Sequence, residues 1–129
     1  MFAMGRIIFA DDDDVIAELV CDAFREAGHA VGWLSDGRSA YEVIRRRPPD
    51  LVILDCNMPE MSGITVLKEI RGSRELYQTP VMMLTAREGE SDERIARFEG
   101  ASDYIRKPFS PSLLVGRAEA LMRGERRWN

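Results

Sequence analysis

Strand-sized apolar segments recur along the chain, and longer stretches with helical spacing separate them. The strand-sized segments lie at residues 7–10, 29–33, 51–54, 81–84 and 103–106. The central ones contain no alternating polar residues, which is typical of strands buried on both faces of a parallel sheet. The pattern therefore predicts five strands, most of them in the interior of the molecule.

Between these strands, apolar residues return at steps of three and four positions, as on one face of an amphipathic helix. The first such stripe consists of Ile16, Leu19, Val20, Ala23, Phe24 and Ala27. Gly28 is expected to end this helix, and Ser62 and Ser110 are expected to cap two later ones. Five helices thus alternate with the five strands.

The helix expected in residues 88–100 differs from the others because it is mostly charged. Its apolar anchors are Ile95, Ala96 and Phe98. A segment with few buried apolar contacts opens at a low cost in free energy. We therefore expect this helix to be the least firmly held element.

Regular alternation of strands and helices predicts an α/β fold, with a parallel sheet and helices on both of its faces. The length of 129 residues fits one domain of ordinary size and is too short for two. Residues 1–124 are expected to form this domain. Residues 125–129 would then be a C-terminal tail or the start of a linker.

The charge of the chain argues against nucleic-acid binding by the chain itself. Its net charge is −4 and its pI is about 5.1, whereas nucleic-acid-binding modules are usually basic. Two basic clusters, at residues 45–47 and 123–127, stand at the ends of predicted helices, where cations complement the helix dipole. We interpret both as solvated helix ends, and the second also as the start of a linker.

Composition and the N-terminus favour a cytoplasmic protein without a membrane span. The apolar runs are far shorter than the roughly 20 residues that a membrane helix needs, and the first residues lack the apolar region and cleavage site of a signal peptide. Cys21 and Cys56 are too few for a disulfide framework. We expect both to be reduced thiols, and the single histidine, His29, to be structural or exposed.

Polar side chains stand where the predicted strands end. The acidic run 11–14 follows the first strand, Asp55 the third, Thr85 the fourth and Lys107 the fifth. Ligands of open α/β sheets bind at the carboxyl ends of the strands, so these residues are expected to converge in one site.

Clustered carboxylates repel one another unless a cation compensates for their charge. Hard oxygen ligands in this number suit Mg²⁺ or a similar divalent ion such as Mn²⁺, and Mg²⁺ commonly takes a phosphate as a further ligand. Lys107 could neutralise that phosphate, and the Thr85 hydroxyl could donate to it. Asp55 would then be the nucleophile that forms an acyl phosphate.

Five motifs follow one another along nearly the whole chain: Ile7–Asp12, Pro49–Asp55, Met58–Gly63, Leu84–Ala86 and Lys107–Phe109. In this order they resemble the receiver domain of two-component response regulators, the family that includes the chemotaxis response regulator. The resemblance implies a flavodoxin-like, doubly wound (βα)5 fold with strand order 2-1-3-4-5. Asp13 and Asp14 extend the acidic run beyond the family pattern, and we expect them to cap the following helix.

The resemblance also implies a role for each site residue. Asp55 would accept a phosphoryl group, and Asp11, Asp12, Asp55 and the backbone carbonyl of Asn57 would hold Mg²⁺ or Mn²⁺, with Asp11 acting partly through water. Lys107, Thr85 and Tyr104 would respond to the phosphate: Lys107 would pair with it, Thr85 would move toward it, and Tyr104 would rotate inward. A cis peptide bond between Lys107 and Pro108 is implied as well.

The function implied by the resemblance is a signalling switch rather than a turnover enzyme. The phosphoryl donor would be a histidine kinase or a histidine phosphotransfer protein. The face formed by the fourth helix, fifth strand and fifth helix would carry the readout, to a second copy of the chain, an output domain or a separate target.

Two other hypotheses remain at this point. A metal-dependent phosphatase or phosphotransferase of haloacid dehalogenase type shares the aspartyl-phosphate chemistry, but it needs an aspartate two positions after the nucleophile, where this chain has Asn57. A degenerate receiver that acts only as a binding module is disfavoured because every switch residue is present.

Overall fold

Five parallel strands alternate with five helices in the computed structural model, which describes residues 4–86 and 90–125. The strands are β1 (Arg6–Ala10), β2 (Ala30–Leu34), β3 (Leu51–Asp55), β4 (Val81–Thr85) and β5 (Asp103–Arg106). The helices are α1 (Asp14–Glu26), α2 (Gly37–Arg46), α3 (Gly63–Arg71), α4 (Glu90–Phe98) and α5 (Pro111–Met122). The sheet order is β2-β1-β3-β4-β5, which confirms the flavodoxin-like α/β fold.

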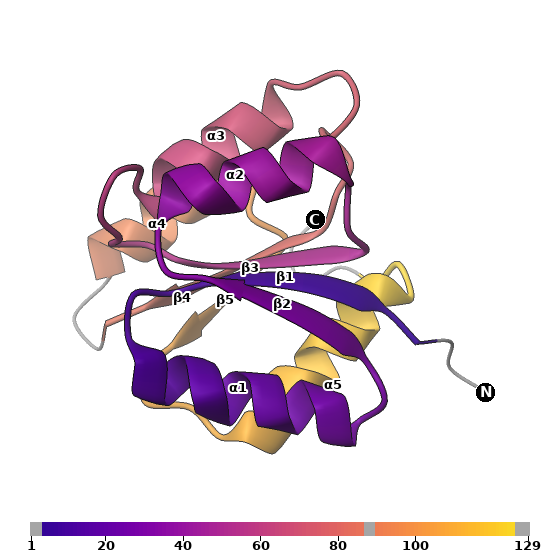
Figure 1. Ribbon diagram of the computed structural model, residues 1–129. Coiled ribbons are helices and arrows are strands. Elements are labelled where there is room, and N and C mark those ends of the chain that lie inside the picture. Colours follow the sequence, from indigo (N-terminus) through magenta and orange to yellow (C-terminus); the bar gives the residue numbers. More distant parts are fainter. Residues whose placement is uncertain (1–3, 87–89, 126–129) are drawn as a thin grey trace.

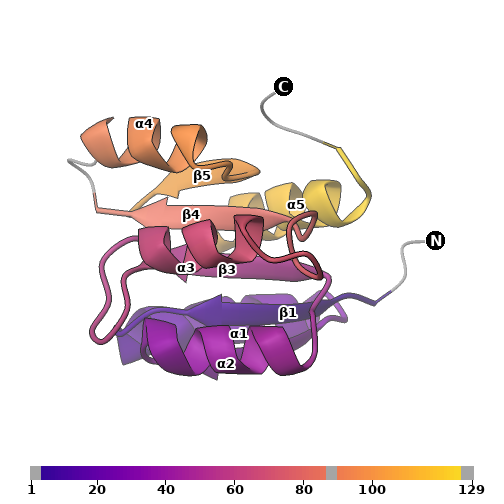
Figure 2. The ribbon, with the colours of Figure 1, turned by 90° about the horizontal axis from the view of Figure 1, so that it is seen from above.

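The molecule has three layers, with the sheet in the middle (Figures 1 and 2). Helices α1 and α5 cover one face, and α2, α3 and α4 cover the other. Along β1 and β3, successive side chains enter opposite cores, as the pleat of a strand requires. Ile7 and Phe9 pack toward α1 and α5, whereas Ile8 and Ala10 pack toward the other three helices.

Side-chain caps determine where the helices begin. The Asp13 carboxylate accepts hydrogen bonds from the backbone N–H groups of Val15 and Ile16, so α1 starts directly after the acidic run. Ser62 and Ser110 cap α3 and α5, as their positions predicted. The expectation for Asp13 is confirmed, while Asp14 is the first helical residue and not itself the cap.

His29 was predicted as the first residue of the second strand, but it lies one residue before the start of β2. Its ring is buried, and its Nδ1 accepts a hydrogen bond of 2.9 Å from the Gly5 N–H. Its Nε2 lies 2.7 Å from Glu119 Oε2 on α5. The structural role is confirmed, but the acid that orients the ring was not predicted, because Glu119 is distant in the chain.

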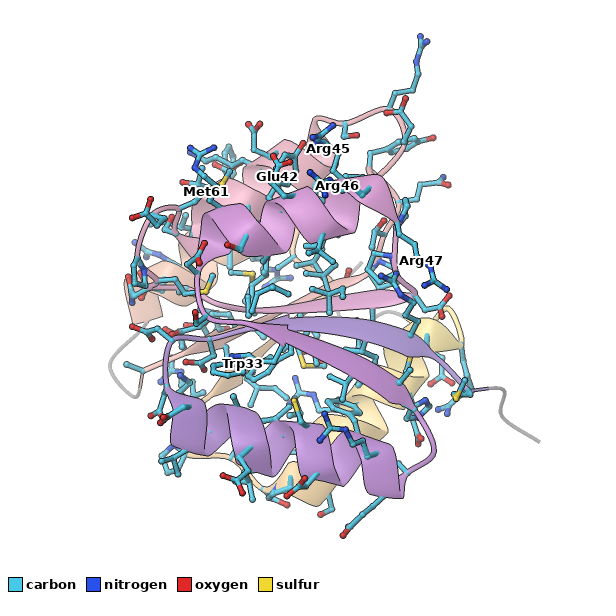
Figure 3. The ribbon with its side chains drawn as sticks, in the orientation of Figure 1. Trp33, Glu42, Arg45, Arg46, Arg47 and Met61 are labelled. Atoms are coloured by element: carbon cyan, nitrogen blue, oxygen red, sulfur yellow. The ribbon has the colours of Figure 1, made fainter. Side chains whose placement is uncertain are left out.

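The basic cluster at residues 45–47 lies at the exposed C-terminal end of α2, as predicted. Glu42, Arg45 and Arg46 are carried on the outer side of this helix (Figure 3), and Arg45 donates a hydrogen bond of 2.9 Å to Glu42. Most of the second cluster, residues 126 and 127, lies outside the described residues. Within residues 4–86 and 90–125, no helix is both long and apolar enough to cross a membrane.

Helix α4 packs differently from the prediction. Ala96 is buried against the core, but Ile95 is 46% exposed and Phe98 is 86% exposed. The expectation that Ile95 and Phe98 anchor this helix is therefore wrong. The physical reason is that α4 covers the edge of the sheet with a narrow face, so that among its side chains at residues 92–98 only the small one of Ala96 is fully buried.

Candidate functional site

The polar strand ends come together at one edge of the sheet. Asp11 directly follows β1, Asp55 and Thr85 are the last residues of β3 and β4, and Lys107 directly follows β5. The four strands are neighbours in the order β1-β3-β4-β5, and all run parallel, so their carboxyl ends meet. The predicted convergence is confirmed for Asp11, Asp55 and Lys107 by the contacts that join them.

Three carboxylates form the centre of the site. One oxygen from each of Asp11, Asp12 and Asp55 lies within 4.8 Å of the others. Asp11 is fully buried and Asp55 is only 7% exposed, while Asp12 is open to solvent. Asp13 turns away to cap α1, and its backbone N–H donates a hydrogen bond of 3.0 Å to Asp11 Oδ1.

The environment of Asp55 opposes its ionisation. Burial raises the pKa of this carboxyl to about 6, and the nearby charge of Asp11 adds to the effect. Lys107 and a backbone hydrogen bond from Asn57 act in the opposite direction and lower the pKa. A second cation in the site would remove the remaining conflict between the carboxylates.

Lys107 connects the carboxylates to β5. Its Nζ lies 2.7 Å from Asp11 Oδ2 and 3.6 Å from Asp55 Oδ2. Partial burial lowers the pKa of this amine, but the hydrogen bond to Asp11 and the charge of Asp55 outweigh it and raise the pKa above its ordinary value. The ammonium is thus charged and held beside Asp55. The Lys107–Pro108 peptide bond is cis, as expected.

The donor set fits a divalent cation of the hard type. Three carboxylates converge, two of them are buried, and one side of the cluster, at Asp12, is open to solvent. Mg²⁺ prefers such oxygen ligands and keeps several waters, which an open side allows. Asp11, Asp12 and Asp55 could therefore hold a metal ion.

Thr85 lies at the other side of Asp55, in a buried polar cluster. Its hydroxyl donates a hydrogen bond of 3.3 Å to Asp92 Oδ2 on α4. The same hydroxyl lies near the Cys56 thiol and the Tyr104 phenol, where it partly offsets the rise in pKa that burial causes in both groups. Tyr104 is 6% exposed and packs among the core residues of the α2–α4 side. Cys56 is buried in the same core, and burial raises its thiol pKa to about 12, so the thiol is not reactive.

Three residues support the site through contacts that the sequence did not predict. Trp33 on β2 donates a hydrogen bond of 2.8 Å from Nε1 to the Asp11 carbonyl, and Figure 3 shows it between the sheet and α1. Gly63 opens α3 against the backbone of Asp55, and its N–H donates to the Cys56 carbonyl at 3.0 Å. Asp92 is the third. Each contact joins residues that are separate in the chain, so spacing alone could not find it.

Comparison with known proteins gives a consistent picture. A family model described as the response regulator receiver domain matches residues 7–119. The chain is 40% identical over 119 residues to the phosphate regulon transcriptional regulatory protein PhoB of Escherichia coli K12, covering 92% of the chain and 52% of that relative. It is 39% identical over 117 residues to the probable transcriptional regulatory protein TcrX of Mycobacterium tuberculosis, covering 91% and 49%. The chain therefore spans about half the length of these relatives.

Solved structures agree with the sequence comparison. A putative response regulator from Chloroflexus aurantiacus J-10-fl superimposes with a TM-score of 0.89 at 32% identity, covering 94% of this chain and 99% of that one. The chemotaxis response regulator CheY4 of Vibrio cholerae gives a TM-score of 0.82 at 30% identity, covering 94% and 98%.

Proposed function

Because the chain belongs to the response regulator receiver domain family, we propose that it is a phosphorylation-dependent signalling switch in which Asp55 accepts the phosphoryl group. Members of this family are regulatory phosphoacceptors rather than enzymes, and their family implies a histidine kinase as partner. A histidine phosphotransfer protein is the other donor that we propose. The observation that carries the proposal is the position of the Asp55 carboxylate, among two further acids and 3.6 Å from Lys107 Nζ.

The metal proposed for the site is Mg²⁺, with Mn²⁺ as a substitute. Asp11, Asp12, Asp55 and the backbone carbonyl of Asn57 would hold it, with Asp11 acting partly through water. The ion would supply positive charge that lets a phosphoryl group approach the carboxylates. Trp33 supports this arrangement, since its hydrogen bond fixes the backbone of Asp11.

The remaining polar residues are proposed to bind and report the phosphoryl group. Lys107 already lies beside Asp55 and would pair with a phosphoryl oxygen. Thr85 would move its hydroxyl toward the new group, and Tyr104 would follow, because its phenol lies near that hydroxyl. The buried position of Tyr104 supports this link. No side chain of the site is needed as a general base, since the Asp55 carboxylate is itself the nucleophile.

The proposal is tested by locating the phosphoryl group chemically. Wild-type protein incubated with acetyl phosphate and Mg²⁺ is expected to gain the mass of one phosphoryl group, and EDTA should prevent the gain. Borohydride reduces an aspartyl phosphate to homoserine, so peptide mass mapping should find homoserine at position 55. Homoserine at another position, or an adduct that forms equally well in EDTA, would contradict the assignment.

The output is proposed to run through the face formed by α4, β5 and α5. Of the elements that would form this face, α4 carries the exposed apolar side chains Ile95 and Phe98, and α5 carries the exposed Leu113. Exposed apolar groups of this size gather at interaction sites. The partner would be a second copy of the chain, an output domain or a separate target. Residues 1–124 would form the switch, and residues 125–129 would be a tail or the start of a linker.

We expect phosphorylation to promote homodimerisation through this face. Beryllofluoride with Mg²⁺, which stands in for the phosphoryl group, should shift the protein from monomer to dimer in size-exclusion chromatography with light scattering. Phe98→Glu should prevent the shift, because Phe98 is 86% exposed and a charge there would have to be buried. Leu19→Glu, a similar change at an exposed position of α1, should leave the shift intact. Wild-type protein that binds beryllofluoride and remains monomeric would contradict homodimerisation.

A further inference from the structure

The Thr85 hydroxyl is already engaged before any phosphoryl group is present. Its Oγ1 donates a hydrogen bond of 3.3 Å to Asp92 Oδ2, a carboxylate in the first half of α4. Thr85 is fully buried, and Asp92 is half-buried, so the contact reaches from the helix into the core. The sequence motifs did not single out Asp92.

The Asp92 carboxylate also acts on the two buried groups that lie near Thr85. Burial is the main reason why the pKa values of Cys56 and Tyr104 are raised, and the charge of Asp92 raises both further. Cys56 follows β3 and Tyr104 lies on β5, the two strands that flank β4 and Thr85.

The two ends of α4 are attached in different ways. At the C-terminal end, Arg71 donates a hydrogen bond of 2.8 Å to the Gly100 carbonyl, and Lys68 lies 3.7 Å from Glu99. In the first half, the described side chains make two such contacts: Asp92 accepts the hydrogen bond from Thr85, and Glu93 forms an exposed ion pair with Arg106 at 3.4 Å. Figure 2 shows α4 beyond α3, at the side of the sheet where β4 and β5 lie. Loss of the Thr85 bond would therefore loosen the first half of α4 while the other end stays attached.

A threonine hydroxyl has one proton to donate and two lone pairs to accept with. In this structure Asp92 takes the proton of the Thr85 hydroxyl. A phosphoryl oxygen on Asp55 needs the same proton. We propose that Asp92 is a positioning residue, which holds the Thr85 hydroxyl on α4 in the unphosphorylated protein and competes with the phosphoryl group for it. Phosphorylation then breaks the bond to α4 and frees the first half of that helix.

This inference rests on the proposed phosphorylation of Asp55. Competition for the Thr85 proton must be distinguished from two simpler effects of the Asp92 charge. Asp92 is an acid near a helix N-terminus, where negative charge is favourable whatever Thr85 does. Removing that charge would also weaken the repulsion of an incoming anion. Both simpler effects are independent of the Thr85 hydroxyl, whereas competition for its proton is not.

The test is a double-mutant cycle on the affinity for beryllofluoride in the presence of Mg²⁺. Each affinity is measured by titration monitored through amide NMR signals. Asp92→Ala is expected to tighten beryllofluoride binding about three- to tenfold, the size of one partly exposed hydrogen bond. In a Thr85→Ala background the same substitution should change the affinity by less than about twofold. Thr85→Ser keeps a hydroxyl, so the Asp92→Ala effect should persist there, and Thr85→Val, which keeps the shape of the side chain without the hydroxyl, serves if Thr85→Ala does not fold.

Glu93→Ala is the matched control, because it removes the same charge from the neighbouring position of α4 without touching Thr85. It should leave beryllofluoride affinity unchanged. An equal effect of Asp92→Ala with and without the Thr85 hydroxyl, or no effect at all, would overturn the role of Asp92 while leaving Asp55 as the phosphoacceptor. Failure of the wild-type protein to bind beryllofluoride would overturn both the inference and the proposed function.

Discussion

Asp55→Asn is expected to abolish Mg²⁺-dependent phosphorylation by acetyl phosphate and, in metal-free buffer near neutral pH, to make the fold more stable. Phosphorylation is lost because an amide cannot attack as a carboxylate does. The fold gains stability because ionised Asp55 is buried beside Asp11, and the amide removes that charge. The two effects together distinguish a functional acid from one that supports the structure, because replacing a structural acid would lower the stability of the fold.

The pH dependence follows from the direction of the shift. Burial, with Asp11 next, raises the pKa of Asp55 from 3.8 to about 6, so the folded protein binds this proton more tightly than the unfolded chain does. The contribution of the protonated Asp55 carboxyl to the free energy of unfolding is fully present below about pH 3.8, and it is lost as the pH rises through about 6. The advantage of Asp55→Asn should thus be small near pH 4 and grow to about 2 kcal/mol at pH 7–8.

Urea unfolding in EDTA across this pH range measures the effect, and adding Mg²⁺ should narrow the difference between wild type and variant, because the ion binds the carboxylates. Asp22→Asn, which changes an exposed carboxylate of α1, should show no comparable trend. If the stability difference between Asp55→Asn and wild type were the same at pH 4 and pH 8, the conflict between charges in this site would not exist in solution.

The strands, the helices and their order could be predicted because they depend on the local pattern of apolar and polar residues. The apolar runs that predicted the third and fourth strands end directly before Asp55 and Thr85. In the structure these two residues are the last residues of β3 and β4. The choice between the four acids after β1 was also predictable, since Asp13 suits an N-cap and Asp11 continues the strand. Strand ends in a parallel sheet must meet at one edge, so the site followed from the topology.

The contacts that tune the site were not predictable, since they depend on how separate elements pack. Trp33 reaches Asp11 from a neighbouring strand, and Asp92 reaches Thr85 from a helix whose apolar stripe was misleading. Ile95 and Phe98 are three positions apart, as anchors would be, but both are exposed. Apolar spacing shows that one face of a helix is apolar, and it does not show whether that face meets the core or a partner.

Gly63→Ala is expected to disrupt both the fold and the site. A Cβ on Gly63 would lie 2.0 Å from the Asp55 carbonyl oxygen and 2.8 Å from its carbonyl carbon, well inside contact distance. The obstructing atoms belong to the backbone of a fully buried strand, so no side-chain rotation can relieve the clash. Either α3 moves away from β3 or Asp55 moves within the acidic cluster. Overpacking of this kind should cost about 3 kcal/mol or more in the free energy of unfolding, measured in urea.

Gly116→Ala is the matched control, because it makes the same chemical change in a helix where nothing lies within 4 Å of the added Cβ. Alanine favours the helix over glycine, so this variant should be about 0.5–1 kcal/mol more stable than wild type. It should also accept the phosphoryl group normally, whereas any folded Gly63→Ala protein should be phosphorylated more slowly. Normal stability and phosphorylation of Gly63→Ala would mean that α3 is not held against Asp55 as closely as the structure places it. A loss of stability in Gly63→Ala beside a gain in Gly116→Ala would show that the position of Asp55 depends on how closely the first turn of α3 packs against β3.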